Sequence, residues 1–178
     1  MAAALSRDTG VESAPTPSDL RSPTQATLTP PTAPDWGLAL GISTADFAAR
    51  AFTSDPGSLK SVRRFVRETI TAWGLAAFAD DTTTVVNELT TNAIRHALDK
   101  DGKPHGKAWL GIARTSSSVV CAVTDPSPAP PSPHAQTDLA PTGRGLLIVD
   151  ALTSSHWGYA ETAPAGKTVW ARIAAPRL

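Results

Sequence analysis

The sequence lacks the residues that several classes of protein require. Its only cysteine is Cys121, which excludes a disulfide framework or a cysteine-ligated zinc site within one chain. Sixteen basic and sixteen acidic side chains give a formal net charge of zero, so charge favours neither nucleic acid nor a membrane surface as a partner. No apolar run reaches membrane-spanning length, and the start has no signal-peptide core. We therefore expect a cytoplasmic protein with one domain.

The first 34 residues differ in composition from the rest of the chain. They are rich in alanine, serine, threonine and proline, and they show no apolar periodicity. Such a segment buries too little apolar surface to offset the entropy lost when it is ordered. The sequence therefore predicts a disordered tail over residues 1–34 and a folded domain over residues 35–178.

Apolar periodicity divides residues 35–178 into helices and strands. Helices are predicted from Asp55-Pro56 to Gly74, from a cap at Asp80 or Asp81 to Ala97, and around 146–152. Alternating patterns predict strands over 38–42, 48–53, 107–113, 119–124, 156–159 and 168–173. The proline-rich run at 126–133 predicts a long loop, and loops of this kind often cover a binding site.

The segment 81–97 carries two stripes at helical spacing. One stripe is apolar and can be buried, and it consists of Val86, Leu89, Ala93 and Ala97. The other stripe is polar, and it consists of Glu88, Asn92, Arg95 and His96. A carboxylate, a carboxamide oxygen and two groups able to meet phosphate, a guanidinium and an imidazole, suit a magnesium nucleotide. An amphipathic helix with a solvated polar face is the alternative.

Two glycine-containing segments bear on phosphate binding. Gly143 and Gly145 precede a predicted helix, and such a start leaves backbone N–H groups free to meet an anion. Gly166-Lys167-Thr168 is similar to the end of a P-loop, but Glu161 stands where the pattern requires glycine. The residues that follow alternate as in a strand, so we exclude a P-loop.

Four segments occur together in a recognisable order. They are Asn87–Ala97, Val123–Ser127, Gly143–Leu146 and Gly166–Trp170. In order and spacing, this set resembles the ATP-binding domain shared by sensor histidine kinases and DNA gyrase, over roughly residues 52–173. The closest resemblance is to bacterial anti-sigma-factor serine kinases. It implies a Bergerat-type, two-layer α/β (α+β) sandwich, in which helices cover one face of a mixed, mainly antiparallel sheet.

The resemblance also implies ATP and Mg²⁺ as ligands, with roles for the residues of the polar stripe. Asn92 would ligate the magnesium ion through its side-chain oxygen. Glu88, one turn earlier, would be the catalytic base that polarises an attacking serine hydroxyl. Arg95 and His96 would approach the phosphates or the ribose.

The remaining motifs would hold the nucleotide. Asp125, at the end of a strand, would accept a hydrogen bond from the adenine amino group, because a carboxylate is an acceptor only. The segment of Gly143, Arg144, Gly145 and Leu146 would place backbone N–H groups at the phosphates, where a helix dipole favours negative charge. Thr168 would add a hydroxyl beside the base.

The resemblance leads to one functional hypothesis and three alternatives. The hypothesis is a regulator of transcription that phosphorylates an anti-sigma-factor antagonist, sequesters a sigma factor, or does both, and that forms a homodimer. The first alternative, a complete sensor kinase, is disfavoured, since it commonly has asparagine in place of Glu88 and needs a helix that residues 1–34 do not supply. The second alternative is a non-catalytic partner-binding module, which Pro126 and Pro128 favour because glycines commonly follow the family's aspartate. The third is an unrelated α/β domain with coincidental motifs.

Overall fold

The computed structural model describes residues 46–100, 103–104, 106–131, 144–162 and 165–174. The predicted tail over 1–34, the predicted strand over 38–42 and Gly143 lie outside these ranges. The proline-rich loop is described as far as Pro131.

One five-stranded sheet forms the first layer of the fold. Its strand order is β1-β4-β5-β7-β6, and every neighbouring pair is antiparallel. The strands are β1 (Asp46–Phe52), β4 (Ala108–Arg114), β5 (Ser118–Asp125), β6 (Trp157–Glu161) and β7 (Lys167–Ala174). The predicted strands within the described residues are confirmed to within two residues at each end. The polar segment after residue 98 also holds a short pair, β2 (Asp99–Lys100) and β3 (Lys103–Pro104).

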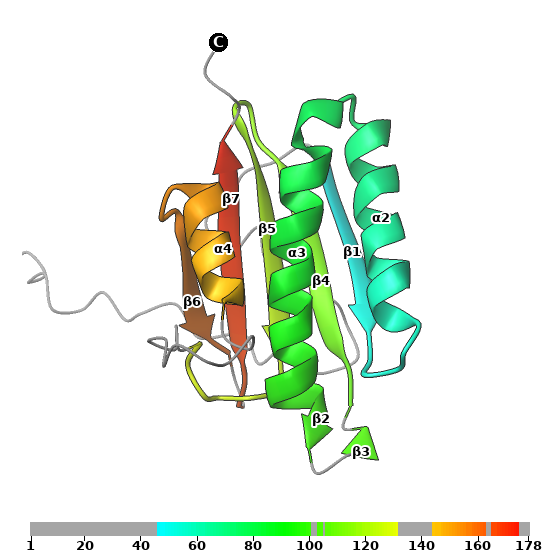
Figure 1. The fold of residues 1–178 in the computed structure, drawn as a ribbon, viewed down its shortest axis with the longest axis vertical. Helices are drawn as coiled ribbons and strands as arrows, with labels where there is room; N and C mark the ends of the chain where they lie inside the picture. The colour runs from blue at the N-terminus through cyan, green and yellow to red at the C-terminus, as the bar shows by residue number, and fades with distance from the viewer. Residues whose placement is uncertain (1–45, 101–102, 105, 132–143, 163–164, 175–178) are drawn as a thin grey trace, which may run out of the picture.

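Within the described residues, three α-helices form the second layer and cover one face of this sheet (Figure 1). They are α2 (Ser58–Ala72), α3 (Ala79–Ala93) and α4 (Gly145–Thr153). A 3₁₀ turn, η2 (Ala76–Phe78), precedes α3, and a π-helical segment, η3 (Ile94–Leu98), continues it. The predicted two-layer α/β sandwich, with a mainly antiparallel sheet and helices on one face, is confirmed. No helix of the described residues is both long and apolar enough to cross a membrane.

The helix starts differ from the predicted ones, whereas the predicted stop is confirmed. Helix α2 begins at Ser58, whose N–H group donates to the Asp55 carbonyl, so the predicted Asp55 cap lies in the preceding turn. Helix α3 follows directly on η2, so Asp80 and Asp81 lie in its first turn. The positive end of the helix dipole stabilises carboxylates at these positions. Gly74 adopts a φ of +71° just after α2, as a C-terminal glycine should.

The core lies between the helices and the covered face of the sheet. On β5, Val119, Cys121 and Val123 alternate toward the helices and are almost fully buried. The four members of the predicted apolar stripe on α3 and η3 are each no more than 3% exposed, which confirms that assignment. Burial of this stripe sets the rotation of α3 about its axis, and therefore the direction of its polar residues.

Two leucines with opposite exposure provide a matched test of this core. Leu110 on β4 is 0% exposed, whereas Leu147 on α4 is 45% exposed. Leu110→Ala removes buried methyl groups and leaves a cavity, so we expect a loss of about 3 kcal/mol in the free energy of unfolding. Leu147→Ala should change it by less than about 0.5 kcal/mol. Urea denaturation of both variants measures the difference, and equal losses would contradict the placement of the core.

Candidate functional site

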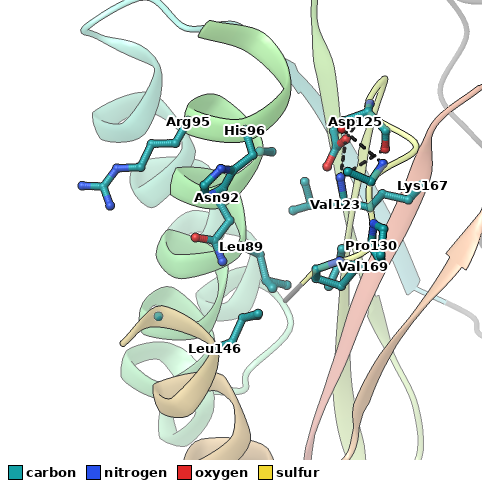
Figure 2. Close-up of a pocket in the computed structure, with 15 residues that line it drawn as sticks. Leu89, Asn92, Arg95, His96, Val123, Asp125, Pro130, Leu146, Lys167 and Val169 are labelled. Carbon is teal, nitrogen blue, oxygen red and sulfur yellow. Dashed lines mark hydrogen bonds and ion pairs between the residues drawn. The ribbon is translucent and has the colours of Figure 1, made fainter. Parts of the chain in front are cut away.

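A cavity of about 520 Å³ lies between α3 and the sheet, at the end where β5 finishes and β7 begins. Its apolar wall consists of Leu89, Ala93, Val123, Leu146 and Val169. Figure 2 shows Leu89 and Leu146 toward one end of this space, and Asp125 and Lys167 toward the other. A small ligand can therefore be held between apolar side chains and contacted at one end by charged groups.

The polar stripe of α3 and η3 forms part of the opposite wall. Asn92, Arg95 and His96 all line the cavity, as the sequence predicts for side chains one turn apart. The guanidinium of Arg95 extends away from Asp125, so Arg95 contributes to the rim (Figure 2). The change from α- to π-helical turns occurs between Ala93 and Ile94 and shifts the angular positions of Arg95 and His96. Turns of this kind are frequent at functional sites.

The far end of the cavity is closed by an ion pair between neighbouring strands. Asp125 stands directly opposite Lys167 in the β5–β7 register, and Lys167 Nζ lies 2.9 Å from Asp125 Oδ1. The two residues are 4% and 6% exposed. Burial raises the pKa of the Asp125 carboxyl above its ordinary value of 3.8, although Lys167, the Ser127 amide and His96 oppose this shift.

Asp125 also holds the start of the proline-rich loop. The Ser127 N–H group donates to Asp125 Oδ1 over 2.9 Å, and Lys167 Nζ donates to the Ser127 carbonyl over 3.1 Å. The first of these bonds is the aspartate turn that an Asp-Pro sequence favours. Beyond this turn, Pro130 and Pro131 line the cavity, so the loop forms one of its walls.

The side chain of Glu88 lies against Gly145, the first residue of α4. A Cβ atom added at Gly145 would lie 2.6 Å from Glu88 Oε2, closer than real Cβ contacts allow, so only glycine lets the carboxylate approach here. A carboxylate beside the first residue of a helix is favoured by the helix dipole. Glu88 does not line the cavity, but Gly145 and Asn92 do, so its carboxylate stands at the cavity margin.

Two predicted residues lie away from the cavity. Arg144 is exposed at the N-cap position of α4. The Thr168 hydroxyl lies 2.7 Å from that of Thr124, its cross-strand partner, on the sheet face turned away from the cavity. Lys167 occupies the position at the end wall, and the sequence reasoning missed it as a site residue. Because Lys167 lies two residues before Val169 on the same strand, the sequence indicates that both side chains face the same side of the sheet. Only the register between β5 and β7 shows that Asp125 is the partner of Lys167.

These features define an α/β domain with a cavity for a small ligand, and comparison with known families identifies its class. The family model described as a histidine kinase-like ATPase domain matches residues 52–173. The chain belongs to this family. Its membership supports ATP binding. No curated protein matches the chain.

The residues present fit a magnesium nucleotide. The cavity volume lies within the range of about 300–1,000 Å³ that is usual for small-molecule sites. The described residues hold no group of three or more His, Cys, Asp or Glu side chains that could bind a metal alone. Magnesium needs no such group when phosphates and water supply most of its ligands. One oxygen from Asn92 would therefore be a sufficient protein contribution.

A double-mutant cycle tests the contact between Glu88 and Gly145. Gly145→Ala forces Glu88 Oε2, at the end of its side chain, to move from its position, whereas Gly145→Ala combined with Glu88→Ala meets only ordinary contacts. We expect a coupling energy of about 1 kcal/mol between the two positions, measured as the free energy of unfolding in urea. Additive effects of the two substitutions would contradict the close approach.

The raised pKa of Asp125 predicts a pH dependence of stability. Above pH 3.8 the unfolded chain ionises at Asp125 while the folded chain still holds the proton, so folding is favoured less as pH rises. The free energy of unfolding of the parent relative to Asp125→Asn should fall above pH 3.8 with a slope of at most about 1.4 kcal/mol per pH unit. Urea denaturation at a series of pH values measures it, and a relative stability that grows with pH would refute the prediction.

Proposed function

We propose that this chain is an ATP-binding regulatory protein of the anti-sigma-factor kinase type. It transfers the γ-phosphoryl group of Mg-ATP to a serine or threonine of an antagonist protein, and it also acts by sequestering a sigma factor. The observation that carries this proposal is the position of Glu88. Its carboxylate lies one helical turn from Asn92 and beside Gly145, both of which line the cavity.

The chemistry assigned to this chain is positioning and proton transfer. Bound Mg-ATP supplies the phosphoryl group, and its magnesium ion offsets the phosphate charge. Glu88 accepts the proton of the attacking hydroxyl at a carboxylate oxygen while that hydroxyl oxygen bonds to the γ-phosphorus. The bond to the bridging oxygen breaks, and ADP is the leaving group. Asn92 would hold the magnesium ion through its carboxamide oxygen, and the N–H groups at the start of α4 would meet the phosphates.

The adenine base is assigned to the other end of the cavity. Asp125 accepts from its amino group, while Leu89, Val123 and Val169 contact its faces. Arg95 and His96 lie nearer the solvent-exposed rim, where the ribose and phosphates emerge. The identity of the protein partner and the homodimer expected from the resemblance stay predictions.

The second candidate is a non-catalytic module that binds its partner through the same fold. Two features favour this module. The proline-rich loop forms a wall of the cavity, and Lys167 binds Asp125 Oδ1, so both restrict the space in which a base is recognised. Calorimetry with Mg-ATP distinguishes the two, since the module does not bind nucleotide at millimolar concentration.

Replacing Glu88 separates catalysis from binding. Glu88→Gln keeps the shape of the side chain but removes its basicity, so phosphate transfer from radiolabelled ATP to purified candidate antagonists should fall about 10²- to 10⁴-fold. ATP affinity, measured by calorimetry on the same protein, should change little. Glu68→Gln is the matched control, because Glu68 is an exposed side chain on α2. Transfer that continues unchanged in Glu88→Gln would refute the assigned role.

Asn92 has its own matched control on the same helix. Asn92 lines the cavity, whereas Asn87 accepts a hydrogen bond from Arg63 of α2 over 3.1 Å at an exposed position. Asn92→Ala should weaken magnesium-dependent ATP binding about tenfold or more, and Asn87→Ala should not. Equal affinities of the two variants would count against a nucleotide site at this cavity.

A further inference from the structure

Among the described cavity residues, the buried Lys167 is the one charged side chain to which neither the resemblance nor the proposed mechanism assigns a role. It enters the cavity from the first position of β7, opposite Asp125. Gly166 permits this entry, since a Cβ atom there would lie 2.7 Å from the Asp125 carbonyl oxygen. An ammonium group at 6% exposure is costly to desolvate, so its position calls for a physical reason beyond surface charge.

Lys167 and Asp125 each have a hydrogen-bonding group that no described residue occupies. A lysine ammonium has three donors, and two of them are used, on Asp125 Oδ1 and on the Ser127 carbonyl. Asp125 Oδ1 accepts from Lys167 and from the Ser127 N–H group. Asp125 Oδ2 accepts nothing from the residues that the structure describes. The end wall of the cavity therefore offers one acceptor and, beside it, one charged donor.

This pattern matches one edge of one purine. Adenine carries an amino donor at position 6 and, next to it, the ring acceptor N1. Guanine in the same orientation presents the reverse, a carbonyl acceptor and an N–H donor, so both of its contacts would be repulsive. Donor and acceptor patterns of this kind discriminate strongly, because the wrong base leaves buried polar groups unpaired.

We propose that Lys167 is a base-reading residue that donates a hydrogen bond to adenine N1 while Asp125 Oδ2 accepts from the amino group. The inference rests on the proposed ATP binding and adds to it a specificity determinant. The bonds to Oδ1 and to Ser127 keep both groups in place before the ligand arrives, which lowers the entropy cost of recognition. The competing interpretation is that Lys167 only neutralises Asp125 and holds the turn.

A chemical double-mutant cycle separates these interpretations. The two proteins are the full parent chain and Lys167→Met, which keeps the apolar stem but has no donor. The two ligands are ATP and 1-deaza-ATP, in which a C–H group replaces N1. We expect the parent to bind ATP about ten- to a hundredfold more tightly than 1-deaza-ATP, and Lys167→Met to bind the two equally.

Each outcome of the calorimetric titration is decisive. A parent that binds both nucleotides equally, or a tenfold preference for ATP that persists in Lys167→Met, overturns the role of Lys167 but leaves ATP binding intact. A parent that binds neither nucleotide overturns the proposed function itself. If Lys167→Met does not fold with Asp125 unpaired, the double variant Lys167→Met/Asp125→Asn replaces it, because no buried charge is then uncompensated. Only the ratio of the two affinities within each protein is compared, so a general loss of stability does not mimic the expected result.

Discussion

The packing of α3 across the centre of the sheet is the constraint on which the rest of the structure depends. Leu89 and Ala93 are both 3% exposed in the core, and this burial fixes the rotation of the helix. Because residues three or four apart share a helix face, the same rotation sets the directions of Glu88 and Asn92. The energy that orients the polar groups therefore comes from apolar burial, at about 25 cal/mol for each Å² removed from water.

The two-residue period of the strands likewise sets the directions of the side chains on the opposite wall of the cavity. Along β5 the residues that face the helices are apolar until Val123, and the next one is Asp125. Along β7 the residues that face the helices begin with Lys167, at the same edge of the sheet as Asp125. The ion pair thus continues the core stripe to the point where the helices stop covering it and the cavity begins. A buried pair adds little to stability beyond a well-packed apolar pair, so its position at the cavity favours a role in recognition.

Local periodicity in the sequence predicts most of this fold, but it does not give the contacts between strands that are distant in the sequence. The stripe from Val86 to Ala97 and the alternation from Val119 to Thr124 are local patterns, and both are confirmed. The pairing of Asp125 with Lys167 joins residues 42 apart, and it depends on a register that no local pattern contains. Motif reasoning also placed Thr168 beside the base, whereas its side chain lies on the face of β7 opposite to that of Lys167 and Val169, as the local two-residue period of the strand requires.

The prolines after Asp125 have a structural consequence that the family's glycines would not have. Pro126 and Pro128 have no N–H group, so Ser127 supplies the only backbone donor in that turn, and this donor is bound to Asp125 Oδ1. Lys167 is bound to the same oxygen and to the Ser127 carbonyl, which ties the loop, the strand end and β7 together. The carboxylate is therefore held in one orientation, and its Oδ2 atom accepts no hydrogen bond from the part of the chain that the structure describes. Stiffness at this position fixes a recognition group in advance, so a proline-rich loop is compatible with nucleotide binding.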